Sequence, residues 1–356
     1  MISRRTALFV VGGSVGAAAT GCSTQAPDPT PAPTTPSPTP TPTADTRPRA
    51  PLTGMLITDP AKLDHAAVAL KVSDVRHSHP QVGLNDADIV FVEPNGIAYT
   101  RLCAVFHSRI PEQAGPVRSI RPVDVPLLSP MKPVLGDTGA ADWVMNYVAA
   151  NSKNIENLYY MKVRGTGSYS IMPGRATEDG VLCHPKTLLK QAKRMKAPPA
   201  ELYLPFATGD DQVSTEVSGT PATKIVVPWG PGKSFNMSYT YDPKTKRYLR
   251  SEPWGKHVLI DGKRVNTDNV LVVRAKWKMD KIFRGGGAKD PVVDIIKGKG
   301  TFYYFNQGKV VKGTWTKAQT TDLFVFTLDD GTPLKMAPGR TFFELPQINA
   351  KVKISS

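Results

Sequence analysis

The sequence predicts an α+β fold, with a mixed α/β N-terminal domain followed by a smaller, mostly antiparallel β C-terminal domain. Short apolar runs alternate with apolar residues at helical spacing up to about residue 205. After residue 223 the chain consists almost entirely of strand-like runs and tight turns. Residues 206–222 lie between these two patterns and show little periodicity. We therefore expect domains at 51–205 and 223–356, joined by a linker at 206–222.

Hydrophobic periodicity and turn residues predict the individual strands and helices. Three β-branched, apolar runs bounded by turn residues predict strands at Val68–Asp74, Asp88–Pro94 and Tyr99–His107. Apolar residues at helical spacing predict helices in "AADWVMNYVAAN" and "PKTLLKQAKRM". Runs such as "NVLVVRAKW", separated by turns such as Asp261-Gly262, predict an antiparallel sheet or barrel in the C-terminal domain. The glycine-rich stretch "IFRGGGAKDP" is expected to be a mobile loop.

The first 22 residues predict a lipoprotein signal peptide. Arg4 and Arg5 precede about fifteen apolar and small residues, which are too few to span a ~30 Å hydrocarbon core comfortably. The run ends in "ATGC", which resembles a lipobox, so Cys22 is expected to receive a diacylglycerol before cleavage. The Sec and twin-arginine export routes both fit "SRRTAL". Residues 23–50 alternate proline with threonine and serine, which predicts an extended tether.

Charge and composition favour a protein that works outside the cytoplasm among polyanions. The chain has a net charge of +15. The first fifty residues hold four basic and two acidic groups, which leaves 41 against 28, a net charge of +13. This charge suits anionic lipids or wall phosphates. Basic residues are scattered, without an arginine-rich arm or a zinc-finger pattern, so no nucleic acid partner is expected.

The segment "GPVRSIRPVDVP" holds the strongest candidates for ligand binding. Arg118 and Arg121 offer rigid guanidinium forks that match carboxylate or phosphate groups. The flanking prolines stiffen the backbone and lower the entropic cost of presenting both side chains. Ser119 and nearby amides could complete an anion nest. Arg101, on a predicted strand, is expected to join the clamp.

Three carboxylates, Asp88, Glu93 and Asp124, are candidates for catalysis. Alternation along the predicted strand puts Asp88 and Glu93 on opposite faces, which weakens them as a general acid/base couple. Glu93 could pair with Arg101 across a hairpin at the mouth of a cleft. In a purely structural reading, Asp88, Asp124 or Asp137 would instead pair with the loop arginines inside the domain.

The sequence predicts no metal and no cofactor. His77 and His79 are two residues apart, but no second ligand pair at short spacing and no HExxH helix occur. GxSxG, Walker A and dinucleotide-binding glycine motifs are also absent. Besides Cys22, the chain contains Cys103 and Cys183. They could form a disulfide in an oxidising compartment, although "RLCAVF" suits Cys103 as a small apolar strand residue.

Several segments match one family pattern together. They are "HPQVGLNDADIVFVEPNGIAYTRLCAVF", "GPVRSIRP", "NVLVV", "GTWTK" and "PGRTFFELP". On these segments the chain resembles the YerB-like lipoprotein family of Gram-positive bacteria across residues 51–346. The resemblance implies a membrane-anchored lipoprotein with two domains of unknown function, and it implies no known reaction. His79 stands where the family pattern has an arginine.

Together these observations predict a lipid-anchored protein on the extracytoplasmic face of the cell membrane, with a binding or adaptor role. Its partners would be the membrane, through Cys22, and an anionic wall glycan, peptide or phosphate-bearing polymer, or an envelope protein. Arg101, Arg118 and Arg121 would hold the anion. Two alternatives stay open: a cell-wall glycan hydrolase or lyase that uses acidic residues, and a purely structural envelope lipoprotein.

Overall fold

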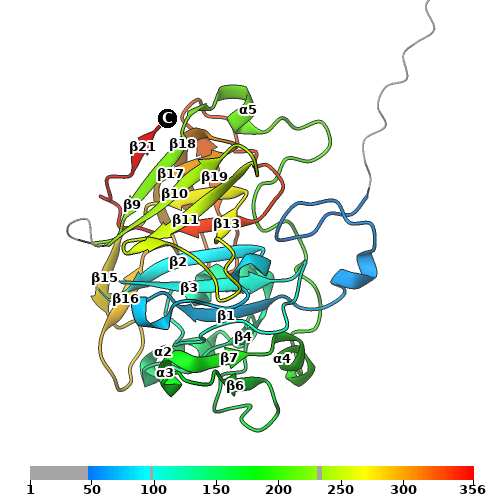
Figure 1. Ribbon diagram of the computed structural model, residues 1–356, viewed down its shortest axis with the longest axis vertical. Helices are drawn as coiled ribbons and strands as arrows, with labels where there is room; N and C mark the ends of the chain where they lie inside the picture. The colour runs from blue at the N-terminus through cyan, green and yellow to red at the C-terminus, as the bar shows by residue number, and fades with distance from the viewer. Residues whose placement is uncertain (1–46, 97–98, 231–234) are drawn as a thin grey trace, which may run out of the picture. The chain divides into compact units, whose positions relative to one another are not determined.

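The computed structural model of the protein describes residues 47–96, 99–230 and 235–356 (Figure 1). The expected signal peptide, Cys22 and most of the expected tether lie outside the described residues and stay predictions. All of the described residues belong to one compact unit. Across the described ranges, no helix is both long enough and apolar enough to cross a bilayer.

An eleven-stranded mixed sheet forms the centre of the described structure. Along the main path its order is β19-β18-β17-β14-β20-β2-β3-β1-β4-β5, and β8 pairs with β18. Central strands are buried on both faces, which explains their continuous β-branched and aromatic runs. The strands are β1 (Val68–Ser73), β2 (Ile89–Asn95), β3 (Tyr99–Phe106), β4 (Val134–Gly136), β5 (Glu156–Asn157), β8 (Thr220–Pro221), β14 (Asn269–Val273), β17 (Gly298–Asn306), β18 (Lys309–Lys317), β19 (Val325–Leu328) and β20 (Thr341–Glu344).

This sheet joins the two halves of the sequence. β2 and β20 run parallel, with Val90 opposite Phe342 and Val92 opposite Glu344. Strands from both expected domains therefore share one hydrogen-bonded sheet, and their hydrophobic side chains belong to one core. The α+β class is confirmed, and the domain boundaries at 206–222 stay a prediction.

A second, smaller sheet packs on one face of β1–β3. Its order is β12-β11-β10-β9-β21, with β13 paired to β11. In Figure 1 its strands lie on one side of β1–β3, and α2–α4 with the β6–β7 hairpin lie on the other. The strands are β9 (Lys224–Pro228), β10 (Asn236–Asp242), β11 (Arg247–Glu252), β12 (Gly255–Lys256), β13 (Asn266–Thr267) and β21 (Lys353–Ser355).

Two hairpins and short helices complete the described structure. The predicted strands at 68–74, 88–94 and 99–107 and both predicted helical segments are confirmed within one to four residues at their ends. The hairpins are β6 (Tyr169–Ile171) with β7 (Val181–Cys183), and β15 (Trp277–Asp280) with β16 (Asp290–Val293). The helices are α1 (Asp124–Leu128), α2 (Asp142–Ala150), α3 (Thr177–Gly180), α4 (Pro185–Gln191) and α5 (Ser214–Ser218), with 3-10 helices η1 (Pro60–Leu63), η2 (Arg76–Ser78), η3 (Leu84–Asp86) and η4 (Ser129–Met131).

The glycine-rich loop between β15 and β16, whose expected mobility stays a prediction, packs on α2. The indole Nε1 of Trp143 donates to the carbonyl oxygen of Ala288 (2.9 Å), and the Phe283 ring lies 5.1 Å from the Tyr147 ring. A Cβ on Gly285 would stand 2.8 Å from the backbone nitrogen of Trp143. Glycine is therefore needed for close approach at this point rather than for mobility.

Buried charges hold the two sheets together. On β11, alternation turns Tyr248, Arg250 and Glu252 towards the main sheet. The Arg250 guanidinium donates to both oxygens of Asp74 (3.3 and 2.9 Å), which directly follows β1, and it also pairs with Glu252. Burial opposes ionisation of Asp74, yet Arg250 holds the pKa of that carboxyl well below its usual value. The pair is therefore strongly stabilised as ions.

Glu344 at the end of β20 accepts two further hydrogen bonds from the second sheet. The Tyr239 hydroxyl (2.5 Å) and the Trp229 indole (2.8 Å) donate to its two oxygens. Burial raises the pKa of Glu344 to about 7, although Arg250 opposes this shift. The interface between the sheets therefore depends on polar contacts with defined geometry as well as on apolar burial.

We predict that Arg250→Met lowers the free energy of unfolding by about 3–5 kcal/mol, because it leaves Asp74 buried without its cation. Urea denaturation would measure this loss. Arg247→Met on the same strand is the matched control. Arg247 is exposed and pairs with Asp268 at 3.2 Å, so its replacement should cost less than about 1 kcal/mol. Equal losses in both variants would contradict the assignment.

Candidate functional site

Alternation along β1–β3 gathers polar side chains on one face of the main sheet. Lys71 stands opposite Cys103, and Ser73 stands opposite Arg101. Arg101 in turn stands opposite Glu93 on β2. Cross-strand neighbours share a face, so these five side chains form what we call the charged face. The second sheet packs on the other face of the same strands.

The loop Gly115–Pro122 brings further cations to the charged face. Val117 forms an antiparallel bridge with β1, and the backbone N–H of Arg118 donates to the carbonyl oxygen of Lys71 (2.9 Å). This register places Arg118 beside Lys71 on the charged face. Gly115 has φ +154°, and a Cβ there would lie 2.8 Å from the carbonyl oxygen at the start of β7. Only glycine allows the loop to enter in this way.

Lys71 is fully buried between two of the predicted carboxylates. Its Nζ donates to Glu93 and to Asp124 (2.7 Å), and all three side chains are 0 % exposed. The other oxygen of Asp124 accepts the backbone N–H of Arg121 (2.7 Å). Burial and the nearby Asp124 raise the pKa of Glu93 to about 8, against the effect of Lys71. Glu93 therefore ionises less readily than an ordinary glutamate, while Lys71 and Asp124 form an ion pair.

Three arginines converge next to this buried group, and we call Arg101, Arg118 and Arg121 the arginine cluster. Arg121 donates to Asn95 on β2 (3.0 Å from Nε) and to Asp290 on β16 (3.1 Å). Arg118 donates to a backbone carbonyl oxygen of α3 (2.7 Å), and its buried Nε has no partner in the described structure. Arg101 is 4 % exposed, and neither its Nε nor its Nη1 has a partner among the described residues.

The environment of Arg101 is electrostatically unfavourable. Burial, followed by repulsion from Arg121 and Arg118, lowers the pKa of Arg101 to about 9. A buried guanidinium without hydrogen-bond partners costs several kcal/mol, which proteins normally offset with an anion. Asp290 supplies one carboxylate, and it pairs with Arg121. The arginine cluster therefore retains hydrogen-bond donors that no described protein group uses.

The remaining predicted residues have mostly structural contacts. Asp88 accepts the backbone N–H groups of His107 and Ser108 (both 2.7 Å) at the end of β3. Asp137 accepts the N–H of Gly139 (2.6 Å), and burial raises its pKa to about 7. Ser119 lies in the loop and is partly exposed. Among the described residues, no hydrogen bond or ion pair joins the side chain of Asp88 or Asp137 to a loop arginine.

Sequence reasoning missed three residues of this site. Lys71 is a single lysine inside the apolar run "VALKVSD", and this break in an otherwise buried strand was a usable signal. Asn95 and Asp290 carried no such signal. Asp290 meets Arg121 from 169 residues further along the chain, so only the tertiary fold reveals the contact.

Cys103 and Cys183 are both buried free thiols. Burial raises the pKa of each thiol well above its usual value. Both therefore lack the thiolate character that nucleophilic or redox cysteines need. The disulfide that the sequence left open does not form in this structure.

His79, Glu252 and His257 are the described residues best placed to hold a metal. One ligand atom from each lies within 4.8 Å of the other two. They lie where the second sheet meets β1–β3, away from the charged face. Sequence spacing could not reveal this group, because the second sheet brings Glu252 and His257 to His79 across more than 170 positions.

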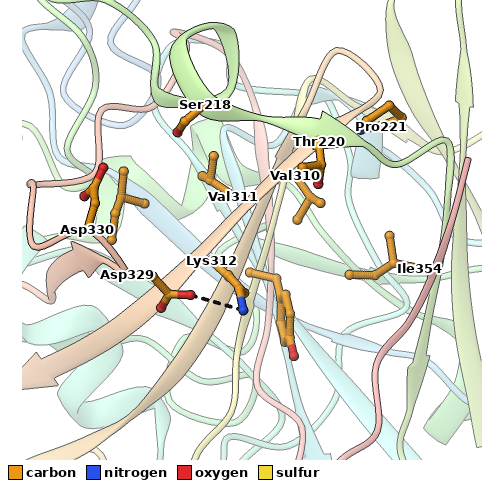
Figure 2. Close-up of a pocket in the computed structure, with 11 residues that line it drawn as sticks. Ser218, Thr220, Pro221, Val310, Val311, Lys312, Asp329, Asp330 and Ile354 are labelled. Carbon is orange, nitrogen blue, oxygen red and sulfur yellow. Dashed lines mark ion pairs between the residues drawn. The ribbon is translucent and has the colours of Figure 1, made fainter.

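An apolar groove of about 490 Å³ lies elsewhere, where β18 meets β8 and β21 (Figure 2). Val310, Val311 and Ile354 line it with apolar surface, and its Lys312 and Asp329 pair with each other at 3.2 Å. The cluster arginines do not line this groove. Its chemistry suits apolar contact rather than an anion.

Comparisons with known proteins agree on family and fold. Two family models match: "Protein of unknown function (DUF3048) N-terminal domain" at residues 52–197, and "Protein of unknown function (DUF3048) C-terminal domain" at 225–343. YerB of Bacillus subtilis (strain 168), whose name describes it as a candidate lipoprotein, is 28 % identical over 327 residues, 85 % of this chain and 87 % of that protein. The crystal structure of YerB from Bacillus subtilis has a TM-score of 0.72 at 23 % identity, covering 87 % of this chain and 100 % of that chain.

We predict that neither Cys103 nor Cys183 reacts with a thiol reagent in the native protein, because both sulfurs are buried. In denaturant without reductant, the chain carrying Cys22→Ser should release two thiol equivalents per molecule. Counting thiols with Ellman's reagent measures both states. A count near zero in denaturant would show a disulfide and contradict the structure.

Proposed function

Because the chain belongs to the YerB-like lipoprotein family, we propose that it is a lipid-anchored envelope protein that binds an anion through its arginine cluster. The observation that carries the proposal is Arg101, a buried guanidinium with Nε and Nη1 unpartnered in the described structure. The anionic group would belong to a wall glycan, a peptide or a phosphate-bearing polymer. The net positive charge of the chain and its similarity to a candidate lipoprotein support an envelope setting.

The charge balance supports binding of an anion rather than a cation. The arginine cluster and Lys71 carry four positive charges. Asp124, Asp290 and Glu93 oppose them with at most three negative charges, and the raised pKa of Glu93, about 8, lowers that total further. Positive charge is thus in excess on the charged face. A phosphate or carboxylate could accept fork-shaped hydrogen bonds from two guanidiniums at once.

The Asp290 carboxylate occupies part of the position that the ligand would take. It comes from β16, whose hairpin contacts β2, and its side chain is 15 % exposed, as is that of Arg121. An incoming anion would compete with Asp290 for Arg121 while gaining the free donors of Arg101 and Arg118. Arg118 and Ser119 are partly exposed, which supports an approach from the loop side.

Glycan hydrolysis fits this geometry less well than binding. A hydrolase needs two carboxylates that reach opposite sides of a glycosidic bond. Glu93 and Asp124 are instead fully buried on the same lysine, and Asp88 is occupied by backbone N–H groups. The alternative of a purely structural lipoprotein makes a different prediction from anion binding, because it requires Arg101 to stabilise the fold.

We predict that Arg101→Met weakens binding of inorganic phosphate at least ~10-fold and raises the melting temperature of the free protein. Binding weakens because two donors are lost, and stability rises because a buried unpaired charge is replaced by an apolar chain of similar length. Isothermal titration and differential scanning calorimetry on the chain carrying Cys22→Ser measure the two effects. Arg109→Met, at an exposed arginine, is the control and should change neither.

Asp290→Asn should change phosphate affinity in the opposite direction. Removing the competing carboxylate should tighten phosphate binding, because Arg121 becomes free to contact the ligand. If Arg101→Met destabilises the protein by several kcal/mol and leaves phosphate binding unchanged, the arginine cluster is structural and the proposed function fails.

The lipid anchor has its own prediction. In the producing bacterium, the protein should fractionate with membranes and lose this association in a Cys22→Ala variant, because the thiol is the acceptor of the diacylglycerol. Membrane fractionation followed by mass spectrometry of the N-terminal peptide would measure it. A processed Cys22→Ala protein that stays with the membrane would contradict lipid anchoring.

A further inference from the structure

The contact between the two sheets contains a second polar group with unused ligand atoms. His79 follows η2, Glu252 ends β11, and His257 follows β12. One ring nitrogen of each histidine and one oxygen of Glu252 lie within 4.8 Å of one another. The charged face and the arginine cluster use none of these three side chains.

Two of these side chains have buried atoms without a hydrogen-bond partner in the described structure. They are Nε2 of His79 and Oε2 of Glu252. The Glu252 side chain is 0 % exposed, so its free oxygen has no access to bulk water. Native proteins rarely leave such atoms unsatisfied, because a buried polar atom without a partner loses its hydrogen bonds to water and gains none in return. A cation between the imidazole and the carboxylate would satisfy both.

A hydrogen bond from His257 to Gln81 orients the His257 ring for metal binding. The amide nitrogen of Gln81 donates to the carbonyl oxygen of Ser73 (2.8 Å), so its Oε1 faces Nε2 of His257 as an acceptor. Nε2 of His257 therefore carries the hydrogen, and Nδ1 keeps its lone pair, 3.1 Å from Glu252 Oε1. An outer oxygen that fixes the tautomer and ring orientation is typical of metal-ligating histidines.

The local charges leave room for a cation. Asp74 and Glu252 both face Arg250, so two carboxyl groups lie beside one guanidinium. Arg250 Nη1 also donates to Nδ1 of His257 (2.9 Å). A metal ion would take over that nitrogen, while Arg250 kept both of its contacts with Asp74. The side chain of His79 is 11 % exposed and supplies the route from solvent.

We propose that His79, Glu252 and His257 form a binding site for a divalent transition metal ion of the zinc type. Two imidazoles and one carboxylate suit Zn²⁺, with solvent in the fourth position. Tetrahedral ligands at ~2.0–2.1 Å from zinc stand roughly 3.3 Å apart. His79 would therefore move inward on binding, and its side chain is the most exposed of the three.

Calorimetric titration with Zn²⁺ tests the site in the full chain carrying Cys22→Ser, which removes the thiol of the leader. We expect one Zn²⁺ per molecule, and binding at least ~10-fold weaker in His79→Ala. His77→Ala is the matched control, since His77 lies two residues away and is 67 % exposed. Zn²⁺ should raise the melting temperature of the His77→Ala variant and leave that of His79→Ala unchanged.

Equal Zn²⁺ affinity in His79→Ala and His77→Ala would overturn the proposal, as would the absence of binding to the unsubstituted chain. His79→Gln serves as a second variant if His79→Ala does not fold, as judged by near-ultraviolet circular dichroism before titration. Phosphate binding should be the same in His79→Ala as in the unsubstituted chain, which separates this site from the arginine cluster.

Discussion

The buried Lys71 ammonium is the constraint on which the charged face depends. It lies inside a strand that is buried along its whole length, so its charge must be matched locally by Glu93 and Asp124. Asp124 begins α1 and also holds the backbone of Arg121. One lysine thus fixes the end of the loop that carries Arg118 and Arg121, and it places both arginines beside Arg101.

Charge is buried on both faces of β1–β3, but with different consequences. On the face towards the second sheet, Arg250 meets Asp74 with good geometry, and the two halves of the sequence are joined by a compensated pair. On the charged face, Arg101 has no matching carboxylate within hydrogen-bonding distance among the described residues. A compensated pair stabilises the fold, whereas an uncompensated cation reduces stability and is retained where function needs it.

Local sequence patterns predicted the strands and helices. They could not predict the long-range contacts, because these depend on the tertiary fold. Runs of β-branched residues gave β1–β3 because alternation and burial are encoded within a few positions. The prolines and the two closely spaced arginines identified the loop as a candidate binding segment. The predicted strand that carries Arg101 added this residue to the candidates. The contact of Asp290 with Arg121, and the approach of His257 to His79, depend on how the second half of the chain folds back. The packing of the glycine-rich loop on Trp143, which requires glycine at position 285, likewise depends on residues far apart in the sequence.

If an anion completes the arginine cluster, a crystal of the protein soaked in tungstate should hold the ion there. Tungstate is a tetrahedral analogue of phosphate and can be located by anomalous scattering. If the cluster binds the anion, we expect an anomalous peak within hydrogen-bonding distance of the Arg101 and Arg118 guanidiniums, with Asp290 displaced from Arg121. An unoccupied cluster in crystals that bind tungstate elsewhere, with Arg101 hydrogen-bonded to protein groups, would contradict it.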